Sequence, residues 1–152
     1  GWLADNIAAR GATRARLSIL GHPPAPPLVP PAIGEPETVP RVAGCICISG
    51  LYDLSVMPVS PAYFGEDAAL YPARSPLSDF ARAEIPMMLI VAEYDPPFIL
   101  QHWLNLQREI LAEANRLPRL FQAKSHNHFS IVFHLDTPDT AMSDAILQFI
   151  QE

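Results

Sequence analysis

Two runs of consecutive apolar residues constrain the fold of this chain more than any other feature. They read VAGCICIS at residues 42–49 and MMLIVA at residues 87–92. A strand that is apolar at every position is buried on both faces, which is typical of a parallel sheet covered by helices. Shorter apolar runs predict two more strands, at residues 16–20 and 119–123. The sequence therefore predicts an α/β fold, with a mostly parallel sheet flanked by helices.

Helical patterns fill much of the remaining sequence. The strongest covers residues 97–115, and its apolar positions are Phe98, Leu100, Trp103, Leu104, Leu106, Ile110 and Leu111. A final helix begins at Asp139 or Thr140, with Met142, Ile146, Leu147, Phe149 and Ile150 expected to point inward. Residues 2–10 are interpreted as the end of a helix, and residues 55–80 as loops with one or two short helices. The length of 152 residues predicts a single domain over residues 1–152.

Composition excludes several classes of partner. The net charge is −6 and the ten Lys and Arg residues are scattered, so we expect no nucleic-acid partner. No apolar run approaches the ~18 residues that span a bilayer, so we expect no membrane span. Cys45 and Cys47 stand two apart in a predicted strand, which is a poor geometry for a disulfide. They predict two buried thiols in a reduced, cytoplasmic compartment.

Chemistry in a parallel sheet is expected beyond the carboxyl ends of its strands. Asp53 follows the second predicted strand, Asp95 follows the third, and His126 and His128 follow the fourth. An acid after one strand and a histidine after the next match the last two members of a Ser-Asp-His triad in chain order. Asp95 has an alternative role as the cap of the helix that follows it. Asp53 is interpreted as a structural turn residue.

Three histidines near the C-terminus would, on their own, suggest a metal site. They are His126, His128 and His134. Zinc sites take their ligands from Cys, His, Asp and Glu side chains at characteristic spacings. No cysteine or carboxylate completes a convincing spacing around these histidines, so we predict neither a metal nor any other cofactor.

Five segments carry a resemblance to a known family. They are DNIAARG…ARLSILGH, ISGLYDL, VAEYDPP, HNHFS and ILQFI, in this order along the chain. Together they resemble the C-terminal half of an α/β-hydrolase, and they are most similar to the carboxylesterase and arylformamidase-like branch. The resemblance implies a serine carboxylic-ester hydrolase that acts on a small ester or amide. It also implies that Asp95 is the triad acid and that His128, which directly precedes an aromatic residue, is the triad base rather than His126.

The nucleophile position departs from that family. The family's elbow usually reads Gly-His-Ser-Ala-Gly, whereas residues 21–25 read Gly-His-Pro-Pro-Ala. Proline has no hydroxyl and fixes φ near about −65°, so Pro23 can neither attack a carbonyl nor form the strained turn. Further prolines exclude the helix that follows an elbow, and residues 23–41 are expected to be an irregular Pro-rich segment. The chain as written is therefore predicted to be inactive.

A frameshift accounts for these prolines in a specific way. The sequence Gly-His-Ser-Ala-Gly-Ala can be written GGC CAC TCC GCC GGC GCC. Loss of the T changes the reading to Gly-His-Pro-Pro-Ala-Pro, as found at residues 21–26. A second shift before Val42 would restore the frame where the resemblance resumes. We hypothesise that residues 23–40 are a frameshifted stretch.

Two other interpretations stay open. The chain can be a non-catalytic pseudo-hydrolase or interaction module, because PPAPPLVPP has the PxxP spacing that aromatic grooves bind as polyproline II. It can also be a fragment without activity of its own, because the resemblance implies a further half-chain upstream with a loop that supplies oxyanion donors. In that case the strand at 16–20 or 42–48 is expected to expose an unpaired edge, which favours homo-oligomers.

Overall fold

A computed structural model describes residue 6 and residues 17–22, 42–56 and 61–152 of the chain. The four strands span Leu17–Gly21 (β1), Val42–Ile48 (β2), Met87–Tyr94 (β3) and Arg119–Asn127 (β4). They form one sheet in the order β1-β2-β3-β4, and every neighbouring pair is parallel. The parallel α/β sheet expected from the apolar runs is therefore confirmed. The helix expected at residues 2–10 and the Pro-rich segment 23–41 lie outside the described residues.

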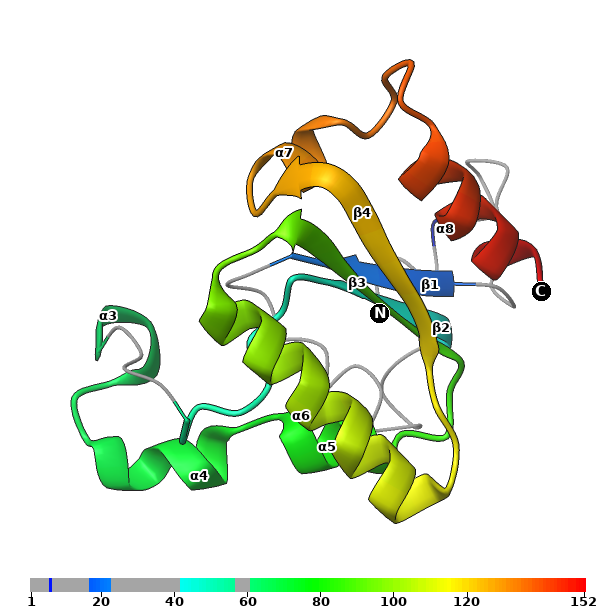
Figure 1. Ribbon diagram of the computed structural model, residues 1–152. Coiled ribbons are helices and arrows are strands. Elements are labelled where there is room, and N and C mark those ends of the chain that lie inside the picture. The colour runs from blue at the N-terminus through cyan, green and yellow to red at the C-terminus, as the bar shows by residue number, and fades with distance from the viewer. Residues whose placement is uncertain (1–5, 7–16, 23–41, 57–60) are drawn as a thin grey trace.

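Helices cover both faces of this sheet (Figure 1). The helices α5 (Leu77–Arg82) and α6 (Pro97–Ala114) lie on one face, and α8 (Ala141–Gln151) lies on the other. Short helices occupy the loop-rich segment, namely α3 (Pro61–Phe64), the 3-10 helix η3 (Ala68–Leu70) and α4 (Tyr71–Arg74). One more short helix, α7 (Ser130–Phe133), follows β4 and has no clear signal in the sequence.

Alternation along β2 and β3 divides the core between the two faces of the sheet. One set of side chains packs with α5 and α6, in a cluster that contains Cys45, Cys47, Phe80, Met87, Leu89, Leu106 and Ile110. The intervening side chains pack with α8, in a cluster that contains Ile46, Ile48, Met88, Ile90, Ala123, Ile146 and Phe149. Successive side chains of a strand point to opposite faces. Because both faces are covered, the buried stretches at 45–48 in β2 and 87–92 in β3 are apolar at every position.

The two cysteines behave as core residues. Both are free and buried, as expected from their spacing in β2. Their Sγ atoms lie 3.4 Å apart, within hydrogen-bonding distance for sulfur. The pKa of the Cys47 thiol lies well above its ordinary value. The hydrogen bond with Cys45 is the main cause, and burial is the second. Cys47 therefore stays a protonated thiol near neutral pH and contributes through packing.

Replacing Phe80 with alanine is expected to lower the free energy of unfolding by about 3–5 kcal/mol. Phe80 has no exposed surface, and its ring meets the Tyr52 ring edge to face with centroids 5.6 Å apart. The truncation leaves a cavity between α5 and the sheet that the neighbours fill only in part. Urea unfolding measures the change, and Leu147→Ala is the control because Leu147 is 54% exposed. Equal losses in the two variants would contradict the packing described for Phe80.

The buried faces of the long helices are narrower than the sequence pattern indicates. Helix α6 buries Ile99, His102, Leu106 and Ile110, and Trp103 packs against this cluster as a partly buried side chain. The positions wrongly expected to be buried are exposed, namely Phe98, Leu104 and Leu111 in α6 and Leu147 and Ile150 in α8. A helix buries one stripe against a sheet, and the stripe of α6 includes a histidine that an apolar pattern omits.

One edge of the sheet is formed by β1. Among the described strands, β1 pairs with β2 alone, which is the position expected of a strand with an unpaired edge. The side chain of Leu20 in β1 is 44% exposed. None of the described helices has the length and apolar character needed to cross a membrane.

Candidate active site

Asp95 lies in a tight turn directly after β3. Its backbone N–H donates to the Ala92 carbonyl at 3.2 Å, and its Oδ2 accepts from the Ala92 N–H at 2.7 Å. The side chain is buried, with only 5% of the residue exposed. The alternative role as a helix cap is not observed, because the N-cap of α6 is Pro96 and no side-chain hydrogen bond caps this helix. The turn instead directs the carboxylate toward the residues that follow β2 and β4.

His128 reaches Asp95 through a bulge in β4. The register pairs Ala92 with Ala123 and Tyr94 with Asn127, so β4 takes four steps where β3 takes two. Ser125 in this bulge has a φ of 62°, and its N–H donates to Glu93 Oε2 at 2.8 Å. Extra residues bend a strand and change the direction of the side chains that follow. The bulge thus brings the loop after β4 back over the end of β3.

The Nδ1 atom of His128 lies 2.8 Å from Oδ1 of Asp95. This contact is the one expected of a triad acid and base, although 33 residues separate the two side chains. Because an ionised carboxylate only accepts hydrogen bonds, the shared proton belongs to Nδ1. The Nε2 atom is then the basic nitrogen, and it makes no hydrogen bond to any described residue. This tautomer is the one that a histidine needs to accept a proton from a hydroxyl.

The end of β1 lies beside His128. His22, the first residue after β1, donates from Nε2 to the His128 carbonyl at 3.1 Å. The two imidazole rings have centroids 4.8 Å apart. The carboxyl end of β1 therefore lies next to the imidazole of His128. Pro23 follows His22 and lies outside the described residues.

Ser49 also contacts Asp95, a role that its sequence context does not predict. It directly follows β2, has no exposed surface and has a φ of 48°. Its Oγ donates to Asp95 Oδ2 at 2.6 Å. The sequence could have indicated its position, because Ser49 follows the strand next to β3. The sequence could not indicate the direction of its hydroxyl.

His126 makes different contacts from His128 and does not touch Asp95. Its Nδ1 lies 3.2 Å from Ser130 Oγ, and its Nε2 lies 3.1 Å from Asp139 Oδ2. Its ring also packs against that of His134, with centroids 4.5 Å apart. These contacts join β4, α7 and the segment before α8. His126 thus closes the loop that carries His128.

The histidines near the C-terminus do not converge on one point. His128 faces Asp95, whereas His126 faces Ser130 and Asp139. Within the described part of the chain, no group of three or more His, Cys, Asp or Glu side chains is arranged to hold a metal ion.

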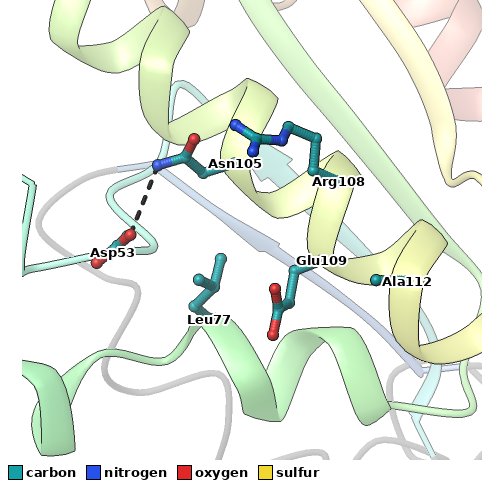
Figure 2. Close-up of a pocket in the computed structure, with 6 residues that line it drawn as sticks. All are labelled: Asp53, Leu77, Asn105, Arg108, Glu109 and Ala112. Carbon is teal, nitrogen blue, oxygen red and sulfur yellow. Dashed lines mark hydrogen bonds between the residues drawn. The ribbon is translucent and has the colours of Figure 1, made fainter.

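A pocket of about 430 Å³ lies between α5, α6 and the loop after β2 (Figure 2). Its lining mixes charged and apolar side chains, namely Asp53, Leu77, Asn105, Arg108, Glu109 and Ala112. Asp53 accepts from the N–H of Ser55 at 3.1 Å and, more weakly, from Asn105 Nδ2 at 3.5 Å. These bonds fit the turn role expected for Asp53. Neither Asp95 nor His128 lines this pocket.

The pH dependence of stability is expected to include a contribution from His102. This ring is fully buried, and its Nδ1 accepts from the Asp53 N–H at 3.1 Å. Burial lowers the pKa of His102 from its ordinary value of 6.5, and the nearby Asp53 charge opposes that change. As pH falls below about 6.5, the unfolded chain therefore binds a proton that the folded chain does not, and stability decreases.

Urea unfolding from pH 7 to pH 5 tests this contribution. The chain with His102 should lose more stability over this interval than a His102→Gln variant, by at most about 1.4 kcal/mol per pH unit. His134→Gln is the matched control because His134 is exposed. Parallel pH profiles for the wild-type chain and His102→Gln would show that the buried ring contributes nothing.

Comparisons with known proteins identify the architecture. No family model and no curated protein matches the sequence. Solved structures match at low identity, and one is a carboxylesterase from Lactobacillus plantarum, with a TM-score of 0.72 and 15% identity over 99% of this chain and 63% of that one. The carboxyl esterase 2 of the fungus Tuber melanosporum gives a TM-score of 0.67 and 16% identity over 99% and 57% of the two chains.

An acylaminoacyl peptidase from Pyrococcus horikoshii is similar as well. It gives a TM-score of 0.68 and 16% identity, over 99% of this chain and 26% of that one. The chain thus spans less than two thirds of each of these three proteins. All three have the α/β-hydrolase fold, and at these identities the likeness shows that this chain has part of the same fold.

Proposed function

We propose that this chain forms the second half of a serine carboxylic-ester hydrolase of the carboxylesterase and arylformamidase-like branch. The observation that carries the proposal is the 2.8 Å contact between His128 Nδ1 and Asp95 Oδ1 at the carboxyl edge of a parallel sheet. Ligands of such sheets bind at that edge. The solved structures that resemble the chain include two carboxylesterases and an acylaminoacyl peptidase.

The roles of the residues follow from this contact. Asp95 holds the imidazole of His128 in the tautomer with the proton on Nδ1. Nε2 is then free to take a proton from a hydroxyl at the end of β1 and to return it to the leaving group. The proposed substrate class is a small ester or amide, since a serine activated by a His-Asp pair acts by acyl transfer. The reaction requires no cofactor.

The chain as written lacks the hydroxyl that this base would deprotonate. Pro23 follows His22 and has no hydroxyl, and Pro24 has no N–H to donate to an oxyanion. We propose that the chain is inactive for this reason. The deciding experiment uses the longest reading frame of the gene and compares p-nitrophenyl acetate hydrolysis with residues 23–26 as written and with Ser-Ala-Gly-Ala at these positions. Absence of activity in both would favour the alternative, a non-catalytic module that uses its Pro-rich segment as a ligand.

Resequencing of the gene tests the origin of the prolines. We propose that one base was lost at the codon for residue 23 and that a compensating shift precedes Val42. Comparison of the gene with those of relatives should show both indels. A reading frame that encodes Pro-Pro-Ala-Pro without either indel would sink the frameshift hypothesis and leave the Pro-rich segment as a genuine feature.

We also propose that the chain associates through the edge of β1. An unpaired strand edge presents N–H and C=O groups that can pair with a second chain. Light scattering should therefore show a mass that rises with protein concentration, and Leu20→Lys should reduce the rise because a charge on an edge opposes pairing. Leu147→Lys, on the exposed face of α8, is the control. A constant monomer mass would contradict the proposal.

The two cysteines bear on the cellular compartment of the chain. Two free cysteines in van der Waals range of each other persist most readily under reducing conditions. On this basis we propose a cytoplasmic location.

A further inference from the structure

Ser49 stands in an unusual position for a serine. It is fully buried, and its backbone has a φ of 48°, which lies in a region that residues other than glycine rarely adopt. Its N–H donates to the Ile90 carbonyl of β3 at 2.8 Å, which ties the end of β2 to the neighbouring strand. Its Oγ donates to Asp95 Oδ2 at 2.6 Å. Such backbone strain persists only where surrounding contacts hold it, and it is frequent at functional sites.

The carboxylate of Asp95 receives three donors from three parts of the chain. Oδ2 accepts from the Ala92 N–H at 2.7 Å and from Ser49 Oγ at 2.6 Å. Oδ1 accepts from His128 Nδ1 at 2.8 Å. The two donors to Oδ2 approach from β3 and from the end of β2, so together they fix the rotation of the carboxylate plane. Oδ1 is then available to accept the hydrogen bond from the His128 imidazole.

We propose that Ser49 is a positioning residue for the Asp95–His128 pair. Its hydroxyl occupies Oδ2 and thereby keeps Oδ1 directed at Nδ1 of His128. This inference rests on the proposed function, in which that pair is the acid and base of a hydrolase. A buried hydroxyl costs free energy unless it is hydrogen-bonded, so the Ser49 proton has one favourable acceptor, and this acceptor is Oδ2. Without the hydroxyl, the carboxylate keeps a single donor on Oδ2 and can turn about its Cβ–Cγ bond.

Proton NMR of the folded chain can detect the hydrogen bond between His128 and Asp95, and this measurement does not require enzymatic activity. The Nδ1 proton of a histidine bonded to a carboxylate gives a resonance far downfield, and its exchange with water reports how often the bond opens. We expect Ser49→Ala and Ser49→Gly to accelerate this exchange by about tenfold, because a charge-assisted hydrogen bond that supports the acceptor is lost. The two variants differ in backbone preference, since glycine relieves the strain at positive φ and alanine does not.

Two controls separate this inference from the proposed function. Ser75→Ala removes another hydroxyl that bonds the Leu54 N–H and the Tyr71 carbonyl, and it should leave the exchange rate unchanged. Asp95→Asn should abolish the downfield resonance. If Asp95→Asn abolishes it while both Ser49 variants exchange at the wild-type rate, the positioning role is wrong and the pair stands. If the resonance survives Asp95→Asn, the pair itself and the proposed function fail. Loss of folding in both Ser49 variants would also overturn the inference, because Ser49 would then support the fold rather than the carboxylate.

Discussion

Restoring Ser-Ala-Gly-Ala at residues 23–26 is expected to raise the rate of p-nitrophenyl acetate hydrolysis by at least about 10⁴-fold, since loss of a triad nucleophile costs on the order of 10⁶. The change is to be made in the longest reading frame of the gene. The expectation follows from the geometry at the carboxyl end of β1. His22, the first residue after β1, contacts the His128 carbonyl, so the end of this strand lies close to the ring. The ring is already held by Asp95 in the tautomer that accepts a proton from a serine.

A single substitution, Pro23→Ser, is the matched control and should restore nothing. It returns a hydroxyl but leaves Pro24, which lacks the N–H that an oxyanion hole takes from the residue after the nucleophile. A fluorophosphonate probe should therefore label residue 23 in the four-residue replacement alone. Probe-sensitive turnover by the unmodified chain would overturn this account of the site.

The fold could be predicted because its determinants are local in sequence. The runs at 42–48 and 87–92 lack polar residues, and a strand of that kind must be covered on both faces. The positions of Asp95 and His128 could be inferred as well, because each follows a strand of the same parallel sheet. The carboxyl ends of such strands share one edge, which brings distant residues together.

The finer features of the site depend on backbone geometry that a pattern does not encode. The bulge in β4 depends on a positive φ at Ser125 and on Glu93, which accepts from its N–H. The role of Ser49 depends on the direction of one hydroxyl. Ser49 and Ser125 both have a positive φ, which in a sequence is usually indicated by glycine rather than serine. The buried stripe of α6 was misjudged for a related reason, since His102 is polar in sequence and fully buried in the structure.

Two histidines two residues apart offer the sharpest test of the site. In the chain restored at residues 23–26, His128→Ala is expected to lower kcat by about 10⁴-fold to 10⁶-fold, because the base acts as one unit with the nucleophile and the acid. His126→Gln is expected to lower it by less than about tenfold, since His126 contacts Ser130 and Asp139 and closes the loop without touching Asp95.

The comparison requires both variants to be folded, and urea unfolding establishes this. Glutamine can replace one of the two hydrogen bonds of His126, whereas no residue but histidine can exchange a proton at Nε2 while Nδ1 stays bound to Asp95. If His126→Gln instead caused the larger loss, the base would be the histidine that contacts Asp139. The contact between His128 and Asp95 would then be structural, and the acid of the triad would have to be sought beyond β4.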